Sequence, residues 1–361
     1  MTRPIYNFAA GPAMLPAPVL RQAQAELRDW QGRGLSVLEM PFTGEAYGEI
    51  ERQARADLRR LLKIPQDYRI LFMQGGASAQ FALVPLNLLG RDGRADYIDT
   101  GHWSRKAITE GRHHCRLRVA ASGAGQGYDG LPDPDAWRLD PRAGYCHITH
   151  NETADGLQFH HIPDTGAVPL VADMTSDLLS RPLDICRFGL VYAAAQKNIG
   201  PAGLTLVIVR DHLLRPARPG TPGLFDYRSL ADNRGRLNTP PTYAVYLAGL
   251  VFRWLLDQGG LAAMAVRNRR QSERLYAAID ASDGYECPVR PADRSQMNHC
   301  FRLTDPAREA DFLRKAEVCG LLNLGGHPAR GGIRASLYNA MPDAGVEALI
   351  DYMAAFVDGQ V

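Results

Sequence analysis

The stretch Tyr192-Ala193-Ala194-Ala195-Gln196-Lys197-Asn198-Ile199-Gly200-Pro201 places a lysine at a turn after an apolar, strand-like run. The chain then enters a second apolar run, Gly203-Leu204-Thr205-Leu206-Val207-Ile208-Val209. A lysine flanked by two buried strands loses hydration, which lowers its pKa toward the range where the neutral amine attacks a carbonyl. Such an amine can form a Schiff base, although strand-end lysines more often extend their charge to solvent.

Two further features would complete a site for pyridoxal phosphate. The buried run Val168–Ala172 ends in Asp173, which is either a turn residue or the acidic partner that keeps the cofactor's pyridine nitrogen protonated. The run Ile70–Met73 leads through Gly75 and Gly76 into an apolar helix start at Ser78. Free N–H groups at such a start favour a phosphate, although Ser78 could equally be a helix cap.

Several longer phrases give the chain a resemblance to a known family. They are Asn7–Pro16, Gly101–Trp103, Asn151–Thr153, Ala195–Gly203, Leu237–Thr242 and Arg334–Pro342. In this order, and over essentially the whole chain, they resemble the phosphoserine aminotransferases. That family lies within the fold-type I pyridoxal-phosphate enzymes, so the resemblance implies an α/β fold, the cofactor pyridoxal 5'-phosphate and a homodimer with shared active sites.

The resemblance also implies a role for individual residues. Lys197 matches the lysine that binds the cofactor and moves a proton, and Asp173 matches the partner of the pyridine nitrogen. Arg334 matches the arginine that binds the substrate α-carboxylate, for which its planar fork is suited. The remaining cofactor contacts that it implies are Trp103 on the ring, Thr153 near the phenolic oxygen, and Ala77, Ser78, Gln196, Asn238 and Thr239 around the phosphate, the last two from the second subunit.

The expected pocket for the substrate's distal group departs from the family pattern. Where the family usually reads Ser-His-Arg-Gly, this chain has Pro41-Phe42-Thr43-Gly44. Ser78 replaces an arginine of many members, and Pro328 replaces the arginine that follows the retained His327. The substrate contacts expected here are Arg334, His327, Phe42 and Thr43. Arg330 is either a partial replacement for the missing arginines or a solvated loop charge.

Composition limits the classes of function. The 361 residues include 45% hydrophobic residues, enough for a large core and two domains. A net charge of +2 gives no basis for binding nucleic acid or a membrane, and no apolar stretch approaches ~18 residues. The six cysteines form no C-x-x-C pair, so neither disulfides nor a metal site is expected. With no signal-peptide pattern at the start, we expect a cytoplasmic enzyme.

The order of apolar runs predicts the architecture. After an N-terminal arm (1–15), a helix is expected at 17–31, followed by alternating strands and helices in a large cofactor-binding domain (16–255). Such alternation favours a mostly parallel sheet of the seven-stranded type, covered on both faces. A long helical region at 244–279 leads into a smaller α+β domain (256–361), with strands expected at 286–290, 298–303 and 332–335.

Two main hypotheses for the function follow. The first is transamination of 3-phosphohydroxypyruvate with L-glutamate, giving O-phospho-L-serine and 2-oxoglutarate, in serine biosynthesis and possibly pyridoxine biosynthesis. The second keeps the chemistry but predicts a less charged 2-oxo acid, because Phe42, Thr43, Ser78 and Pro328 are neutral. A binding protein without turnover is disfavoured, because it would need neither Lys197 as proton carrier nor Arg334 as carboxylate clamp.

Overall fold

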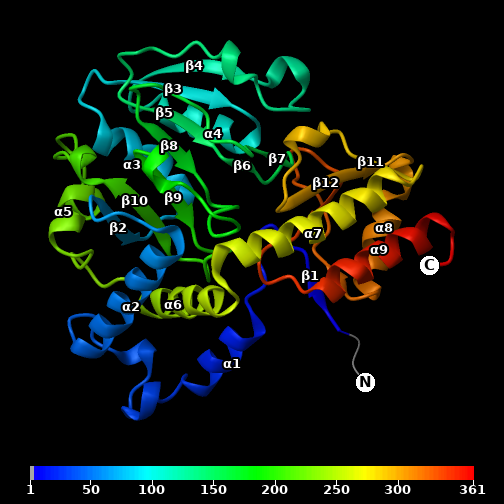
Figure 1. The fold of residues 1–361 in the computed structure, drawn as a ribbon, viewed down its shortest axis with the longest axis horizontal. Helices are drawn as coiled ribbons and strands as arrows, with labels where there is room; N and C mark the ends of the chain where they lie inside the picture. Colours follow the sequence, from blue (N-terminus) through cyan, green and yellow to red (C-terminus); the bar gives the residue numbers. More distant parts are fainter. Residues whose placement is uncertain (1–3) are drawn as a thin grey trace.

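The computed structural model describes residues 4–361 and contains a seven-stranded sheet. Its order is β2 (Tyr68–Met73), β10 (Thr205–Arg210), β9 (Leu190–Ala194), β8 (Leu170–Asp173), β5 (Cys146–Thr149), β3 (Arg94–Asp99) and β4 (Arg116–Ser122). β10 is antiparallel to both of its neighbours, and the other pairs are parallel. The predicted α/β fold with a mostly parallel sheet is therefore confirmed (Figure 1). β2 and β4 are the edge strands of the sheet.

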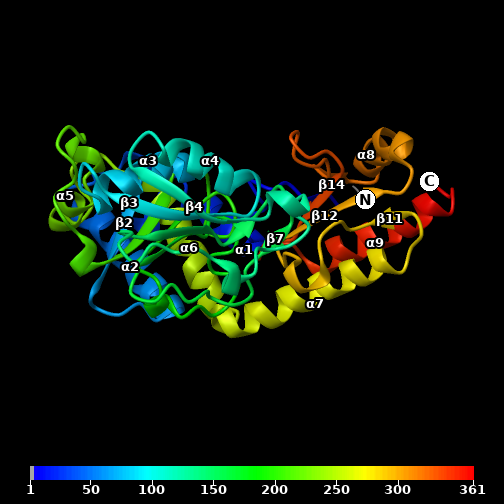
Figure 2. The same ribbon diagram turned by 90° about the horizontal axis from the view of Figure 1, so that it is seen from above.

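Helices cover both faces of this sheet because its strands are apolar on both sides. Ile70 and Phe72 of β2 face one buried cluster, whereas Leu71 and Met73 face the other. The first cluster includes residues of α1 (Ala17–Ala25), α2 (Glu45–Leu62) and α6 (Thr242–Asp257). The second includes residues of α3 (Gly76–Leu88), α4 (His102–Gly111) and α5 (Tyr227–Asp232). The sheet therefore lies between two layers of helices (Figure 2).

A smaller α+β unit lies beside the large sheet (Figure 1). Its strands are β11 (Tyr285–Glu286), β12 (Asn298–Leu303) and β14 (Ile333–Ser336), and its helices are α7 (Gly260–Asp280), α8 (Glu309–Val318) and α9 (Asp343–Val357). Phe301 and Phe312 lie in a separate core with Leu349. The strands expected at 298–303 and 332–335 are present, whereas β11 overlaps the strand expected at 286–290 only at Glu286. The proposed domain boundaries at 15 and 255 stay a prediction.

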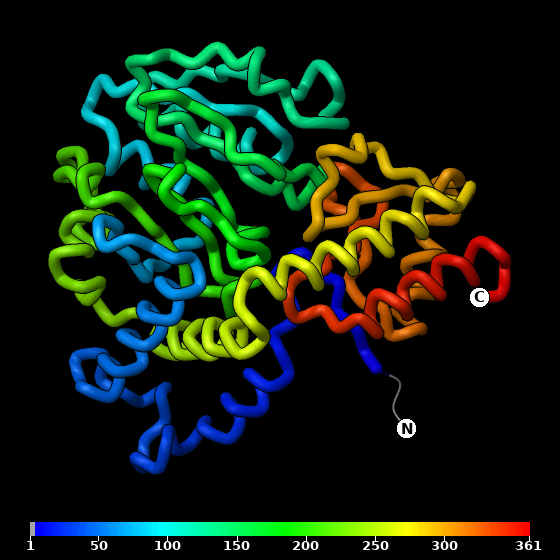
Figure 3. Tube along the Cα trace, in the orientation of Figure 1, coloured from blue at the N-terminus to red at the C-terminus, as the bar shows by residue number. Residues whose placement is uncertain are grey.

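The N-terminal arm packs against this C-terminal unit. Residues 1–3 lie outside the described part of the chain, and β1 (Tyr6–Asn7) pairs in parallel with β13 (Leu321–Leu322). Phe8 is fully buried in the core of the smaller unit. From there the arm passes between the two halves toward α1 (Figure 3). The arm therefore joins the first and last parts of the chain.

Two predicted helices differ from those observed. The helix expected at 17–31 ends at Ala25. Leu20 is exposed because α1 turns only Val19 and Ala23 into the core, and Leu27, beyond the end of the helix, is also exposed. The helix expected at 244–279 is divided into α6 and α7. Gly259, between them, and Gly260, the first residue of α7, have φ of +91° and +75°, a conformation that interrupts a right-handed helix.

Candidate active site

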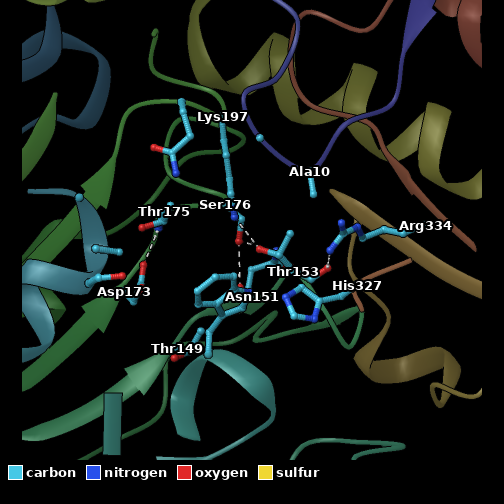
Figure 4. Close-up of a pocket in the computed structure, with 16 residues that line it drawn as sticks. Ala10, Thr149, Asn151, Thr153, Asp173, Thr175, Ser176, Lys197, His327 and Arg334 are labelled. Carbon is cyan, nitrogen blue, oxygen red and sulfur yellow. Dashed lines mark hydrogen bonds between the residues drawn. The ribbon is translucent and has the colours of Figure 1, made fainter. Parts of the chain in front are cut away.

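The ends of three neighbouring strands form a pocket of about 330 Å³ (Figure 4). Thr149 is the last residue of β5, Asp173 is the last residue of β8, and Lys197 follows β9 in the turn to β10. Open α/β sheets place their ligands at this edge. The turn is held close to the sheet because Gly200 packs on α6, where a Cβ would lie 3.3 Å from the Ala248 Cα.

Lys197 carries an amine of reduced basicity. Its side chain is buried, and Nζ donates a hydrogen bond of 2.6 Å to Thr153 Oγ1. Burial lowers the pKa of Lys197 to about 8, with Arg334 lowering it further, although Asp173 opposes the change. A substantial fraction of the amine is therefore neutral near pH 8, as a nucleophile requires.

Asp173 lies on another wall of the pocket from Arg334 (Figure 4). Burial raises the pKa of Asp173, while hydrogen bonds from Thr175, including Thr175 N to Oδ1 at 2.9 Å, oppose the rise. A carboxylate in this position is incompletely stabilised by the protein itself. A protonated ring nitrogen in the pocket would supply the missing positive charge.

The start of α3 lines the pocket with backbone. Gly75 and Gly76 have φ of +102° and +67°, and Gly76 N donates to Thr205 Oγ1 at 2.9 Å. Ala77 and Ser78 follow in the first helical turn and line the pocket together with Gln196. N–H groups of a first turn have no acceptor within their helix, so they favour an anionic group.

Trp103 is positioned by two buried carboxylates at the start of α4. Trp103 N donates to Glu152 Oε2 at 2.8 Å, and His102 N donates to Asp155 Oδ2 at 2.8 Å. Gly101 is required for this approach, because a Cβ there would lie 2.5 Å from Asp155 Oδ2. Burial and the neighbouring Asp155 raise the pKa of Glu152 to about 8. The Trp103 indole, positioned by these contacts, lines the pocket.

The smaller unit supplies Arg334 and His327. Arg334 lies on β14, and its Nη1 donates to the Thr153 carbonyl oxygen at 3.3 Å. The imidazole of His327 lies against that of His102, with ring centroids 4.2 Å apart. Arg334 and His327 both line the pocket, so the site lies between the two halves of the chain.

Four residues predicted for the site do not line the pocket of their own chain. Phe42 packs against the core beside α2, and Thr43 is exposed. Asn238 lines a different cavity, and the Thr239 carbonyl accepts a hydrogen bond from Gln74 Nε2 at 3.3 Å. The expectation that Phe42 and Thr43 contact the substrate therefore finds no support within one chain.

Arg330 is neither a solvated charge nor a residue of the pocket. It forms an ion pair with the buried carboxylate of Asp155, and its guanidinium lies 4.9 Å from the centre of the Tyr128 ring. This contact fixes the loop that carries His327 to the segment that positions α4.

Sequence reasoning missed several polar and backbone groups of the pocket. Ala10 and Gly11 of the N-terminal arm line it, held by hydrogen bonds from Tyr338 Oη to the Ala10 carbonyl and from Ala13 N to the Gln196 carbonyl. The other missed residues are Thr149, Asn151, Thr175 and Ser176. The polar pair Thr175-Ser176, separated from Asp173 only by Met174, was a usable signal, because it follows a strand end.

The residues present fit pyridoxal phosphate. Trp103 Nε1 and Arg334 Nε are buried without a hydrogen-bond partner among residues 4–361, which indicates that a polar ligand completes the site. The pocket combines a weakly basic amine, a buried carboxylate and free backbone donors. Among residues 4–361, no group of His, Cys, Asp or Glu side chains could hold a metal ion. No helix in this range is both long and apolar enough to cross a membrane.

The fold and pocket together define an aminotransferase of the fold-type I class, and comparisons specify the family. The model of the class-V aminotransferases matches residues 5–349. Phosphoserine aminotransferase of Pseudomonas paraeruginosa is 56% identical over 356 residues, 99% of both chains. The solved phosphoserine aminotransferase of Bacillus circulans subsp. alkalophilus is 43% identical, with a TM-score of 0.97 and 99% of both chains covered.

A pyridoxal-phosphate-bound phosphoserine aminotransferase from Trichomonas vaginalis is 38% identical, with a TM-score of 0.93 over 97% of this chain and 99% of that one. Identity at this level over complete chains reaches well beyond a shared fold. The chain belongs to the class-V aminotransferases and, within them, to the phosphoserine aminotransferase family.

Proposed function

We propose that this chain is a pyridoxal-phosphate-dependent phosphoserine transaminase. It converts 3-phosphohydroxypyruvate and L-glutamate to O-phospho-L-serine and 2-oxoglutarate, a step of serine biosynthesis. The observation that carries the proposal is the buried Lys197 amine between Asp173 and Arg334, in a chain that matches phosphoserine aminotransferases over 99% of its length. The alternative of a less charged substrate, drawn from Phe42, Thr43, Ser78 and Pro328, is not supported by these comparisons.

The chain's own residues supply positioning and proton transfer. Pyridoxal phosphate, when bound, withdraws electrons from the substrate Cα. Lys197 Nζ accepts the Cα proton and returns it to the carbon that receives it, which its pKa of about 8 permits. Asp173 would accept a hydrogen bond from the protonated ring nitrogen, and the backbone of Ala77 and Ser78 would bind the phosphate. Arg334 orients the α-carboxylate through its guanidinium fork.

The substrate assignment is tested by half-reactions of the loaded enzyme. The holoenzyme is mixed with phosphoserine, glutamate or O-methylserine, and the loss of the cofactor's long-wavelength absorbance is followed. We expect phosphoserine and glutamate to react at least about tenfold faster, per unit concentration, than O-methylserine, because charge-assisted hydrogen bonds are stronger than neutral ones. Equal or faster reaction of O-methylserine would contradict the assignment to phosphoserine.

The basicity of Lys197 predicts how cofactor capture depends on pH. Only the neutral amine reacts with the aldehyde, so capture by the cofactor-free protein should accelerate as pH rises and level off above about 8, the pKa of Lys197. Stopped-flow absorbance at saturating cofactor measures this midpoint. Free pyridoxal phosphate with Nα-acetyl-lysine, whose ε-amine is free, serves as control and should show a midpoint near 10.5, the ordinary pKa of lysine. A midpoint near 10.5 in the protein would contradict the conclusion that burial lowers the pKa of Lys197.

We further propose a homodimer with shared active sites. Asn238 and Thr239 lie outside the pocket of their own chain, where they are free to reach a second one. Large apolar side chains are exposed in the same half of the chain, namely Leu20, Leu27, Leu38, Leu224 and Leu237. A second copy would bury them, which favours association.

Subunit mixing tests this proposal. Lys197→Ala chains and Asn238→Ala, Thr239→Ala chains should each be nearly inactive, whereas a refolded mixture should regain up to about a quarter of wild-type activity. That fraction follows because half of a random mixture is heterodimer with one undamaged site of two. No recovery in heterodimers isolated by two affinity tags would show that each site is built within one chain.

For the compartment we propose the cytoplasm. All six cysteines are free in the structure, including the buried Cys146 and the exposed Cys186. Unpaired thiols persist in a reducing compartment. Fractionation of cells that express a tagged chain tests this placement.

A further inference from the structure

A second cavity, of about 270 Å³, lies away from the cofactor pocket and is lined mainly by arginines. It is formed by α2, by β2 at the edge of the large sheet, and by the segment after α5, and it shares no lining residue with the first pocket. Figure 1 shows these elements on the side of the large sheet opposite to the smaller unit. Among residues 4–361, the arginines that line it are Arg52, Arg55, Arg59, Arg69, Arg234 and Arg236.

Acidic partners for these arginines are few. Glu51 is buried and forms ion pairs with both Arg55 and Arg236, and Asp211 forms one with Arg69. Within residues 4–361 the cavity therefore has four more guanidinium groups than paired carboxylates. Burial, and then the charges of Arg55 and Arg69, lower the pKa of Arg59, although Asp211 opposes the change. An anion would relieve this repulsion.

The cavity contains both fixed and free cations. Arg59 donates to the carbonyl oxygens of Pro65 and Tyr68 at 2.8 and 2.7 Å, so its guanidinium is held in place. Arg52 and Arg234 are exposed, and their guanidinium groups have no hydrogen-bond or ionic partner among residues 4–361. The cavity thus combines a guanidinium group held in place with two exposed guanidinium groups that have no partner among residues 4–361.

Two glycines make room for this arrangement. A Cβ on Gly48 would lie 3.2 Å from Arg52 Nη1 and 3.3 Å from Arg236 Nη2. A Cβ on Gly235, where φ is +78°, would lie 3.2 Å from Arg55 Nη2. The guanidinium groups therefore approach the backbone closely at two places, Gly48 and Gly235. Charges that are merely scattered over a surface do not need such close approach.

We propose that this cavity is a binding site for a small phosphate-bearing anion with at least two negative charges. Guanidinium forks match phosphate oxygens, and a phosphate offers three acceptors to donors that arrive from different directions. The volume of about 270 Å³ admits an inorganic pyrophosphate or a phosphorylated three-carbon acid, below the size usual for larger cofactors. Arg234 and Arg236 precede Asn238 by four and two residues, so the cavity lies next to the segment that we propose reaches the second subunit.

Calorimetry with pyrophosphate on the holoenzyme tests this site. Arg52→Gln, Arg234→Gln is compared with Arg60→Gln, Arg269→Gln, which removes the same charge, with Arg60 on the same helix, from exposed positions outside the cavity. We expect the first variant to bind pyrophosphate at least about tenfold more weakly at low salt, and the control to bind within about twofold of wild type. Transaminase activity without added anion should be unchanged in both.

Three results would overturn the proposal. One is equal pyrophosphate affinity in the two variants, which would mean that net charge alone attracts the anion. Another is citrate binding as tightly as pyrophosphate, which would remove the preference for phosphate. A third is dissociation of dimers in Arg52→Gln, Arg234→Gln without any pyrophosphate binding by wild type, which would assign the arginines to a second copy of the chain.

Discussion

Replacing Lys197 with alanine is expected to lower transamination by at least about 10²–10⁴, while the protein still binds pyridoxal phosphate. Proton transfer by a positioned general base alone is worth about this factor, and the loss of covalent attachment adds to it. Binding should persist because the Ala77–Ser78 backbone, Trp103 and Asp173 remain in place. Single-turnover kinetics with phosphoserine and a titration of cofactor fluorescence measure the two effects separately.

The chain offers a matched control in Lys106. Its ammonium lies 5.2 Å from the centre of the Trp103 ring, so it is close to the pocket but is not one of the residues that line it. Lys106→Ala should keep activity within about a factor of three. Borohydride reduction followed by peptide mapping should place the cofactor on Lys197. Labelling of Lys63, Lys106 or Lys315 instead would refute the assignment of the nucleophile.

The centre of the site could be predicted from the sequence, because the residues adjacent to Lys197 and Asp173 determine where these side chains lie. Lys197 and Asp173 each follow an apolar run, and the ends of such strands meet at one edge of a parallel sheet. The turn at Gly75 and Gly76 likewise predicts that a helix begins after a strand. These features depend on contacts between neighbours in the sequence, so they can be read without the tertiary structure.

The parts that sequence patterns missed depend on distant contacts. The N-terminal arm reaches the pocket through pairing of β1 with β13, over three hundred residues further along the chain. Arg330 is held by Asp155, which nothing near Arg330 in the sequence indicates. The arginine cavity likewise combines α2, β2 and the segment at 231–236. Phe42 and Thr43 lie outside the pocket of their own chain, which their neighbours in the sequence do not indicate.

Asp173→Asn is expected to affect activity and stability in opposite directions. Loss of the carboxylate should lower transamination at least about a hundredfold, the scale of removing one preorganised electrostatic contact. The cofactor-free protein, by contrast, should become more stable at neutral pH. Burial raises the pKa of Asp173, so its charged form opposes folding until a positive ring nitrogen is bound. The asparagine side chain has nearly the same shape and carries no charge.

The pH dependence of unfolding identifies this effect and supplies its control. Because the folded pKa of Asp173 is raised above 3.8, its contribution to wild-type stability falls as pH rises from about this value. Asp173→Asn should remove this contribution and leave that of Glu152, whose pKa is also raised. Asp177 gives the opposite sign. Burial acts to raise its pKa, but the contact with His150 at 2.5 Å and the hydrogen bond from Gln158 lower it overall. Asp177→Asn should therefore destabilise the protein above about pH 4. Urea unfolding of cofactor-free proteins between pH 4 and 8 measures both, and destabilisation by both substitutions would refute the view that Asp173 awaits a cationic partner.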